Sequence, residues 1–465
     1  MTSLPLEPLL RLPKLLALTP SHGGDRLAYY SDASSRFELY RYDLTTRRET
    51  RLTDGNAPRT PRSGLVWGRD GQTLYYADDH GGDEKTDLWR LALGGHPERL
   101  SDAPDVQDTP VEASPDGKTL LVSSTRGGQR TLFAYDLEAQ SWRQLTRFGS
   151  PVYGGRWSPD GAWLAFTANE SADFSNQDGY LLRADGSETR RVLHVAEGSE
   201  DDVHAWHPDG SRLAVSSDAS GVNRAGILTL ETGDVRWLGA GEADETPVEF
   251  SPDGRWLLAV RNADAERSLV LYDLHSDLQD DAATGAARNL DLPPGVAWDG
   301  AFVLGGRALV LKHAHARSPG DVLLYDLGTE RAEPLIAADL GEIALERLVG
   351  SEAVRYPAAD GQLVPALLYR PQRVPEGEKR PALIQIHGGP TWQFFRDFDA
   401  FAQHLVSRGC VVLQPNVRGS TGYGAAWRDA ALHDWGGGDL ADVAAGARFL
   451  ASLPEVDAGR IGVMG

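Results

Sequence analysis

The chain has 465 residues, of which 41% are hydrophobic and 24% are charged, and its formal net charge is −21. This length is too great for one ordinary domain, so we expect two or more. The acidic balance argues against a nucleic-acid partner, because binding to phosphates requires a basic face. We interpret it as a solubilising surface charge.

Two features of the N-terminus and the cysteine content bear on location. Residues 1–14 form an extension that is rich in leucine but interrupted by Pro5, Pro8 and Pro13. They therefore resemble neither a signal peptide nor a membrane span, and no later apolar stretch approaches 18 residues. Cys410 is the only cysteine, which excludes an intrachain disulfide. We expect a cytoplasmic protein without a membrane partner.

A turn of four residues recurs through residues 15–340. Its clear copies are Gly68-Arg-Asp-Gly71, Ser114-Pro-Asp-Gly117, Ser158-Pro-Asp-Gly161, His207-Pro-Asp-Gly210 and Ser251-Pro-Asp-Gly254. The aspartates of these copies are 46, 44, 49 and 44 residues apart. Degenerate copies at 21–24 and 304–306 bring the number of repeats to seven. Proline, aspartate and glycine each favour this turn for a local backbone reason, so we assign the motif a structural role.

Each repeat has the content of one propeller blade. A strand-like run follows the turn, and a second apolar strand, a polar turn and a short strand come next. About 45 residues with four short strands are typical of a blade. All seven units appear in the same phase, with no strand left over at the N-terminus. The sequence therefore predicts an all-β seven-bladed β-propeller that closes by packing between its first and last blades.

The pattern changes in residues 341–465. A hairpin turning at Asp360-Gly361 comes first, and strands then alternate with helices. Buried strands are predicted at 381–389 and 410–417, and a third begins at Arg460. Alternation of this kind indicates a mostly parallel sheet. We therefore expect a second domain of the α/β class here.

The loop after the first buried strand has a composition suited to catalysis. It reads His387-Gly388-Gly389-Pro390. In α/β-hydrolases the loop at this place supplies one backbone N–H of the oxyanion hole. Glycines suit that task because a bare backbone can approach the reacting carbonyl closely. Taken alone, the four residues fit a plain strand-to-helix turn equally well.

Three further motifs follow in order: 416–424 (NVRGSTGYG), 433–439 (HDWGGGD) and 460–465 (RIGVMG). This series, behind seven propeller repeats, resembles the prolyl oligopeptidase family of serine peptidases. The resemblance covers the whole chain, because that family also carries a seven-bladed propeller ahead of its hydrolase domain. It implies that residues 341–465 are the N-terminal half only of an α/β-hydrolase domain. It implies a peptidase that hydrolyses short peptides, since a propeller over the site keeps folded proteins out. It implies no cofactor and no metal.

The resemblance assigns roles residue by residue. Gly389 would supply the oxyanion N–H, Gly388 would shape its loop, and Gly465 would be the first glycine of the nucleophile elbow. The nucleophile would lie two residues past Gly465, and the acid and base would follow it. No catalytic triad residue is therefore expected within the chain. His387, His404 and His433 all precede the elbow, so none fits the role of base.

The residue that begins the oxyanion motif favours one branch of the family. Prolyl oligopeptidases and dipeptidyl peptidases have a tyrosine there, whereas His387 is similar to the acylaminoacyl-peptidase branch. A helix with paired glutamates, which dipeptidyl peptidases use to hold a free amino terminus, is not evident. Asp201-Asp202 and Asp83-Glu84 are the available acidic pairs. A dipeptidyl peptidase stays an alternative, and blocked N-termini are expected to be tolerated.

Other residues near the predicted site are candidates for a substrate pocket. Besides His387, these are Trp392, Phe395, Arg418 and Tyr423. The aromatic residues that follow the oxyanion loop either line a pocket for an apolar side chain or hold the next helix in place. Arg418 either contacts the substrate or forms a structural ion pair with Asp439 or Asp442, and we favour the ion pair.

Two alternatives lie outside the peptidases. A lipase or carboxylesterase shares the hydrolase fold and the oxyanion loop, but the presence of a propeller argues against an enzyme of this class. A non-catalytic binding propeller is the second. The sequence leaves open whether the protein forms a homo-oligomer. A polypeptide that ends at Gly465 would leave the strand 461–464 at the edge of its sheet, and we expect such a polypeptide to aggregate or to keep a disordered hydrolase half.

Overall fold

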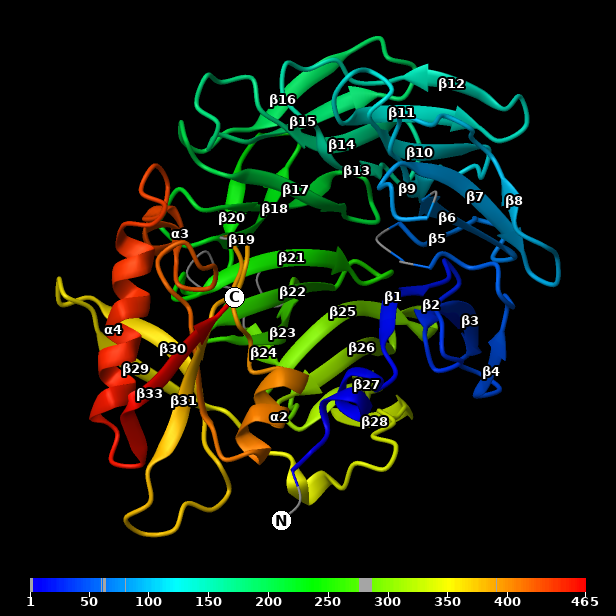
Figure 1. Cartoon of the computed structure of the whole chain (residues 1–465). Helices are drawn as coiled ribbons and strands as arrows, with labels where there is room; N and C mark the ends of the chain where they lie inside the picture. Colours follow the sequence, from blue (N-terminus) through cyan, green and yellow to red (C-terminus); the bar gives the residue numbers. More distant parts are fainter. Residues whose placement is uncertain (1–2, 60, 62–63, 80, 276–286, 390) are drawn as a thin grey trace.

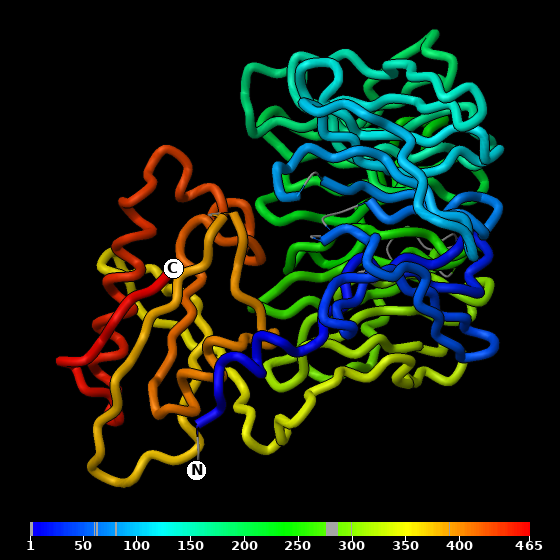
Figure 2. The backbone as a smooth tube through the Cα atoms, turned by 45° about the vertical axis from the view of Figure 1, so that its right-hand side comes forward, coloured from blue at the N-terminus to red at the C-terminus, as the bar shows by residue number. Residues whose placement is uncertain are grey.

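The computed structural model describes residues 3–59, 61, 64–79, 81–275, 287–389 and 391–465. Figure 1 shows a ring of small sheets beside a mixed α/β part, and Figure 2 shows these two parts as separate lobes. The short helix α1 (Leu6–Leu10) precedes the first sheet and lies against the α/β part through α2 (Ala400–Ser407).

Seven four-stranded antiparallel units make up the ring. The first four units comprise β1 (Leu15–Pro20), β2 (Arg26–Ser31), β3 (Glu38–Asp43) and β4 (Arg48–Arg51); β5 (Val66–Trp67), β6 (Thr73–Asp79), β7 (Thr86–Ala92) and β8 (Glu98–Arg99); β9 (Asp108–Ala113), β10 (Thr119–Ser124), β11 (Thr131–Asp136) and β12 (Ser141–Gln144); and β13 (Tyr153–Trp157), β14 (Trp163–Ala168), β15 (Asp178–Arg183) and β16 (Thr189–Leu193).

The last three units comprise β17 (Asp201–Trp206), β18 (Arg212–Ser217), β19 (Arg224–Thr229) and β20 (Val235–Trp237); β21 (Asp244–Phe250), β22 (Trp256–Ala263), β23 (Glu266–Asp273) and β24 (Ala287–Asn289); and β25 (Val296–Val303), β26 (Ala308–His315), β27 (Ser318–Asp326) and β28 (Arg331–Ile336). One parallel bridge, between Arg267 and Val296, joins the sixth blade to the seventh. The short 3-10 helix η1 (Leu304–Gly306) lies between β25 and β26.

The recurrent turn works as its residue types predict. In the third blade, the carboxylate of Asp116 accepts hydrogen bonds from Ser114 Oγ at 2.6 Å and from the Lys118 amide at 3.1 Å. Gly117 adopts a φ of +72°, which a side chain would oppose. Asp160 and Asp253 make the same pair of bonds in their own blades. These turns join the first and second strands of a blade.

The ring closes by packing, without a shared strand. The first blade consists of β1–β4 alone and the seventh of β25–β28 alone. Leu27 and Tyr29 of the first blade share one buried core with Val303 and Val310 of the seventh. The Leu304 amide also donates to the Gly24 carbonyl at 2.8 Å, so the two degenerate turns meet at the closure. The predicted seven-bladed fold is confirmed.

A five-stranded sheet forms the core of the α/β part, in the order β29-β30-β32-β31-β33. Its strands are β29 (Glu352–Pro357), β30 (Leu363–Tyr369), β31 (Arg380–Gln385), β32 (Val411–Pro415) and β33 (Val456–Met464). The hairpin β29–β30 is antiparallel, whereas β31 runs parallel to both β32 and β33. The helices are α2, α3 (Ala425–Asp429) and α4 (Gly438–Ser452), and η2 (Leu345–Arg347) precedes β29. This is part of an α/β-hydrolase domain, as predicted, and among the described residues no helix is long and apolar enough to cross a membrane.

Two propeller hairpins insert into the α/β part. Ala265, between β22 and β23, and Ala316, between β26 and β27, are buried in one cluster with Leu367 and Val406. The Ala265 carbonyl accepts from the Arg396 amide at 2.8 Å, and the Ala316 carbonyl accepts from Gln403 Nε2 at 2.7 Å. The sixth and seventh blades therefore form the apolar side of the interface between the two parts.

Candidate active site

Three parallel strands place the predicted site residues at one edge of the sheet. The Ile386 amide, just after β31, donates to the Met464 carbonyl of β33 at 2.8 Å. A Cβ built on Gly465 would lie 3.4 Å from the Ile386 Cβ, so Gly465 is adjacent to the start of the glycine loop. The carboxyl ends of parallel strands are where α/β sheets bind their ligands. The glycine loop therefore begins beside Gly465, although Ile386 and Gly465 are 79 positions apart in the sequence.

The two glycines of the loop differ in backbone conformation. Gly389 has a φ of +135°, and a Cβ built on it would lie 3.0 Å from the Trp392 Cβ and 3.1 Å from the Thr391 nitrogen. A Cβ on Gly388 would meet nothing within 4 Å. Only Gly389 therefore requires glycine for its conformation. Both residues are exposed, so a substrate carbonyl can approach their amides. Pro390 lies outside the described residues.

The imidazole ring of His387 holds this residue in place through two contacts. Its Nε2 lies 3.0 Å from Ser420 Oγ, and its ring meets that of Phe394 edge to face at 5.3 Å. Burial lowers the pKa of His387, which favours the neutral imidazole. Ser420 Oγ donates to the Val417 carbonyl at 2.6 Å, and Ser420 is fully buried. His387 is thus placed to brace the loop against the segment that follows β32.

The other two histidines lie apart from this edge. His404 Nδ1, on α2, is 2.7 Å from the Leu4 carbonyl, which ties the N-terminal extension to the helix. His433 has a φ of +62° in the loop before α4. Neither has an acidic partner that would make it a general base, within the described part of the chain.

A second brace on the loop comes from Asn416, which the sequence did not single out. Its Oδ1 accepts from the Phe394 amide at 2.7 Å, and its Nδ2 donates to the Phe394 carbonyl at 3.0 Å. The same Nδ2 donates to the Tyr423 hydroxyl at 2.8 Å. Asn416 is fully buried, and burial raises the pKa of Tyr423 to about 12. Asn416 and Tyr423 therefore form a polar clamp on the backbone of the glycine loop.

The candidate pocket residues Trp392 and Phe395 do lie together. Their rings meet edge to face at 5.7 Å, and Trp392 is 51% exposed. Phe395 also contacts Trp298 of β25 edge to face at 5.1 Å, and the Arg267 guanidinium lies 4.5 Å from the Trp298 ring centre. The aromatic group therefore extends from the glycine loop to the seventh blade. Trp298 was missed because nothing in the sequence relates it to a loop almost 100 residues later.

The side chain of Arg418 forms structural ion pairs with two carboxylates. Its Nε and Nη2 donate to Asp442 at 3.0 and 2.6 Å, and its Nη1 donates to Asp360 at 2.6 Å. The carboxylates raise the pKa of the guanidinium further above its ordinary value. Because Asp442 is fully buried, this contact is a structural ion pair, which is the alternative that we favoured for Arg418 from the sequence.

A second arginine joins the two parts of the molecule. Arg428 of α3 donates to Glu200 and to Asp218 of the propeller, each at 2.8 Å, and to Asp429 beside it at 2.7 Å. Burial raises the pKa of Glu200 to about 7. Glu200 lies next to the acidic pair Asp201-Asp202, but that pair is on strand β17 and not on a helix. We call Arg428, Glu200, Asp218 and Asp429 the interdomain ion cluster.

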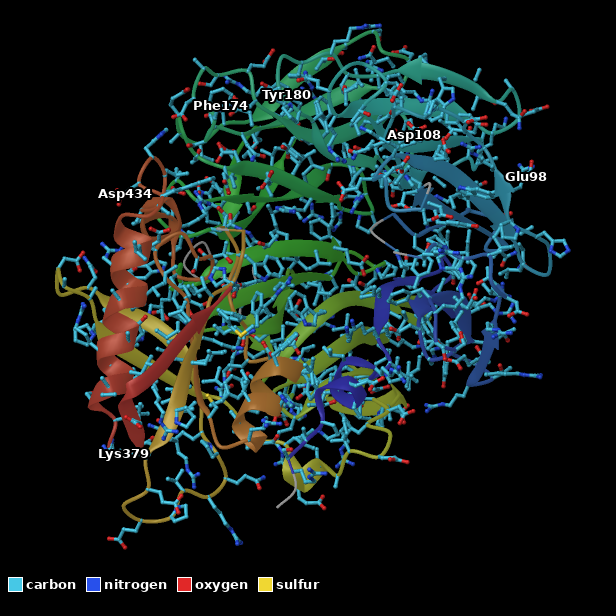
Figure 3. All side chains as sticks on the ribbon, in the orientation of Figure 1. Glu98, Asp108, Phe174, Tyr180, Lys379 and Asp434 are labelled. Carbon is cyan, nitrogen blue, oxygen red and sulfur yellow. The ribbon has the colours of Figure 1, made fainter. Side chains whose placement is uncertain are left out.

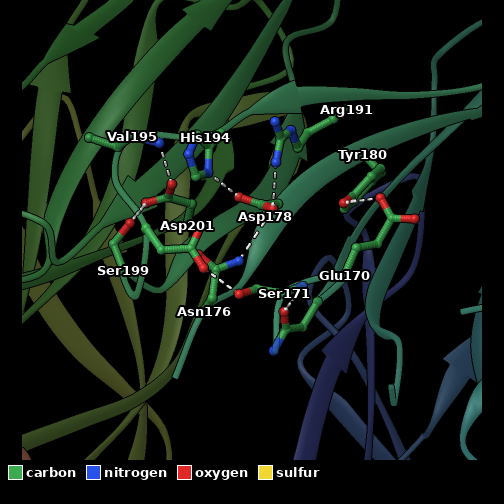
Figure 4. A network of polar contacts seen from close by, with 12 residues as sticks. Glu170, Ser171, Asn176, Asp178, Tyr180, Arg191, His194, Val195, Ser199 and Asp201 are labelled. Atoms are coloured by element: carbon green, nitrogen blue, oxygen red, sulfur yellow. Dashed lines mark hydrogen bonds and ion pairs between the residues drawn. The ribbon is translucent and has the colours of Figure 1, made fainter. Parts of the chain in front are cut away.

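Figure 4 shows a separate polar network between the fourth and fifth blades. Asp178, His194 and Asp201 have the spacing of metal ligands, the only such group among the described residues. All four carboxylate oxygens already have protein partners. Asp178 contacts His194 at 2.7 Å and Arg191 at 3.2 Å, and Asp201 accepts from Ser199 at 2.9 Å and from the Val195 amide. The network therefore acts as a joint between β15, β16 and β17.

Two family models match the chain. Residues 91–288 match the TolB beta propeller domain, and residues 396–465 match the prolyl oligopeptidase family. The second match contains Asn416, Ser420, Arg428 and Gly465. Residues 396–465 are therefore similar to the prolyl oligopeptidase family, and residues 91–288 are similar to the TolB type of propeller.

Curated relatives are peptidases. An uncharacterized peptidase YuxL of Bacillus subtilis (strain 168) is 25% identical over 453 residues, which cover 67% of this chain and 68% of the relative. Dipeptidyl-peptidase 5 of Porphyromonas gingivalis is 22% identical, over 71% of this chain and 48% of the relative. The chain thus spans about two thirds of one relative and less than half of the other.

Solved structures share the fold. A puromycin-hydrolyzing peptidase of Mycobacterium tuberculosis superposes with a TM-score of 0.82 at 21% identity, covering 98% of this chain and 73% of that one. An acylaminoacyl peptidase in complex with a chloromethyl ketone superposes with a TM-score of 0.69 at 17% identity, covering 99% of this chain and 74% of that one. Both likenesses establish the arrangement of propeller and hydrolase sheet.

Proposed function

We propose that this chain, whose C-terminal part is similar to the prolyl oligopeptidase family, is the propeller and part of the catalytic domain of a serine peptidase for short peptides. The observation that carries the proposal is that Gly465 lies against Ile386, where the glycine loop begins, at the carboxyl edge of β31 and β33. This is the arrangement that an elbow nucleophile and an oxyanion loop require. In this proposal the nucleophile, acid and base follow Gly465.

The residues of this chain prepare the oxyanion hole. The Gly389 amide donates to the carbonyl oxygen of the scissile bond as that oxygen becomes negative in the tetrahedral intermediate. A donor fixed in this way lowers the barrier because it need not reorganise during the reaction. Asn416 and the ring of His387 hold the loop in place through Phe394 and Ser420. Trp392 and Phe395 offer an aromatic surface beside the scissile bond.

The contacts with the propeller support short substrates. The loop after β31 contacts the sixth and seventh blades, and α3 contacts residues 200 and 218 near the fifth. A peptide must therefore enter through the ring or between the two parts, which folded proteins cannot do. We keep the cytoplasm as the proposed location, because the sequence has a single cysteine.

Within the peptidases, we favour an acylaminoacyl-type or related oligopeptidase. His387 occupies the first position of the oxyanion motif, and Glu200 and Asp218 are already paired with Arg428 instead of facing a free amine. A dipeptidyl peptidase is the second candidate, because relatives that align with 63% and 71% of this chain carry that name.

The test uses the full-length peptidase and two anilide substrates with the same scissile residue. One substrate is an N-acetylated aminoacyl anilide and the other is a dipeptidyl anilide with a free amine. We expect the blocked substrate to be hydrolysed at least as efficiently, and a fluorophosphonate to abolish the activity. Hydrolysis of the free dipeptide alone would move the assignment to the dipeptidyl peptidases. Turnover of a matching ester but of neither anilide would favour a carboxylesterase, and no turnover of any substrate would favour a binding propeller.

A further inference from the structure

A cavity lies at the opposite edge of the hydrolase sheet from the candidate active site. Its volume is about 380 Å³. It is bounded by the amino end of β31, the carboxyl end of α2, the loop after β30 and the segment that leads into β29. It is lined by Leu4, Arg347, Val349, Pro371, Gln372, Arg373, Arg380, Val406, Ser407, Arg408 and Gly409.

The lining is strongly basic in a strongly acidic protein. Four of the lining side chains are arginines, and no acidic side chain lines the cavity among the described residues. The whole chain, in contrast, has 67 acidic and 46 basic residues other than histidine. Lys379, at the foot of the hydrolase part in Figure 3, directly precedes Arg380 and adds to the positive charge of this region.

Several of these guanidinium groups have unused donors. Within the described part of the chain, the side chains of Arg373 and Arg408 form no ion pair or hydrogen bond. Arg380 pairs with Glu378 at 2.7 Å, but its Nε is buried without a hydrogen-bond partner. A buried N–H that lacks a partner is costly, and a bound acceptor would remove that cost. The cavity therefore combines positive charge with an unsatisfied buried donor.

The C-terminus of α2 lies at the cavity, and its partial negative charge does not cancel the positive charge of the arginines. The last carbonyls of α2 accept hydrogen bonds from the chain itself: the Gly409 amide donates to the Val406 carbonyl at 2.9 Å, and the Cys410 amide donates to the Leu405 carbonyl at 3.0 Å. The turn is allowed by a φ of +86° at Gly409. These internal hydrogen bonds largely offset the partial negative charge at the C-terminus of α2, and Arg408 is the residue directly at that terminus.

We propose that this arginine cavity binds a small molecule with two or more negative charges on phosphate or carboxylate groups. Guanidinium groups match both kinds of oxyanion through paired N–H donors, and they bind them more strongly than neutral donors do. The volume falls in the range of small-molecule sites, so it accommodates more than a single inorganic ion. Because the lining comes from five separate segments, the bound molecule ties the N-terminal extension and the interdomain connection to α2.

The experiment is isothermal titration calorimetry of the full-length protein with pyrophosphate, inorganic phosphate and citrate at matched ionic strength. We expect saturable 1:1 binding of at least one of the three anions. A preference for pyrophosphate identifies a phosphate ligand, and a preference for citrate identifies a carboxylate ligand. The bound anion should also raise the melting temperature by about 2 °C or more at saturation, because it binds only the folded state.

The variants separate this cavity from general surface charge. In R373Q/R408Q the dissociation constant should rise about tenfold or more, because two charge-assisted contacts are lost. Arg408→Lys keeps the charge but not the paired donors, so it should bind with intermediate affinity. Arg147→Gln removes an exposed arginine of the third blade and should leave the affinity unchanged. Absence of saturable binding by all three anions, or equal affinity in wild type and R373Q/R408Q, overturns the proposal.

Discussion

Gly389 and Gly388 illustrate how much a single backbone position decides at the candidate site. Both were predicted from the motif that contains them, and the structure gives them different conformations. Gly389 has a φ of +135° with three atoms close to its missing side chain, whereas Gly388 has open space. The sequence could indicate that a glycine is needed in this loop, but not which of the two carries the constraint. That depends on the path of the loop toward Trp392.

The first prediction follows from this difference. In the full-length peptidase, Gly389→Ala should lower kcat about 100-fold with little change in KM, because the added Cβ displaces the amide that stabilises the developing oxyanion. Gly388→Ala is the matched control and should retain most of the activity. Steady-state kinetics on one anilide substrate provide the measurement. A Gly389→Ala enzyme with unchanged kcat and only a raised KM would remove Gly389 from the oxyanion hole.

At the level of elements, the sequence correctly predicted the order of strands and turns but not the contacts between loops. The turns around Asp116, Asp160 and Asp253 are local, so their residue types are sufficient to predict them. The clamp of Asn416 on Phe394 is different, because it exists only when β32 pairs beside β31. A single sequence does not give that pairing. The same holds for Arg418, where the local alternatives Asp439 and Asp442 were foreseen but the second partner, Asp360 from the β29–β30 turn, was not.

The second prediction concerns this clamp. Asn416→Ala removes the partners of the Phe394 amide and carbonyl, and each buried group left unpaired costs about 1–3 kcal/mol. We expect faster hydrogen exchange of the segment 391–396, measured by mass spectrometry, and a lower melting temperature. Tyr423→Phe is the matched control, because it removes only the hydroxyl that accepts from Asn416 Nδ2. Equal protection of 391–396 in wild type and in Asn416→Ala would show that the loop does not depend on the clamp.

At the scale of the whole molecule, the interface between propeller and hydrolase part has two sides of different chemistry. The sixth and seventh blades insert Ala265 and Ala316 into an apolar cluster, and both chain connections lie on that side. The interdomain ion cluster fastens α3 to residues 200 and 218 near the fifth blade. The sequence predicted both parts, but not this interface, because Arg428 and its propeller partners are more than 200 residues apart.

The third prediction concerns the pH dependence of this contact. Burial raises the pKa of Glu200 from its ordinary value near 4.5 to about 7; Asp218, Asp202 and Asp429 add to this rise, and Arg428 opposes it. The folded protein therefore binds more protons than the unfolded chain between these two values. Ionisation of Glu200 accordingly makes the folded state less stable as the pH rises from about 4.5 to 7, and the loss is complete above that range.

Glu200→Gln isolates this effect, because glutamine imitates the protonated carboxyl and has no charge to bury. At pH 5 the variant and the wild type should melt at similar temperatures, and the variant should become the more stable of the two as the pH rises to 7.5. Arg428→Gln removes the one favourable charge, so the pKa of Glu200 should rise further and the decline of stability should extend to a higher pH. Differential scanning fluorimetry over this range measures both differences. The melting temperatures of Glu200→Gln and wild type could instead differ by the same amount from pH 5 to 7.5. That result would mean that Glu200 titrates as an ordinary surface carboxylate, and that Glu200 does not make the charged side of the interface sensitive to pH.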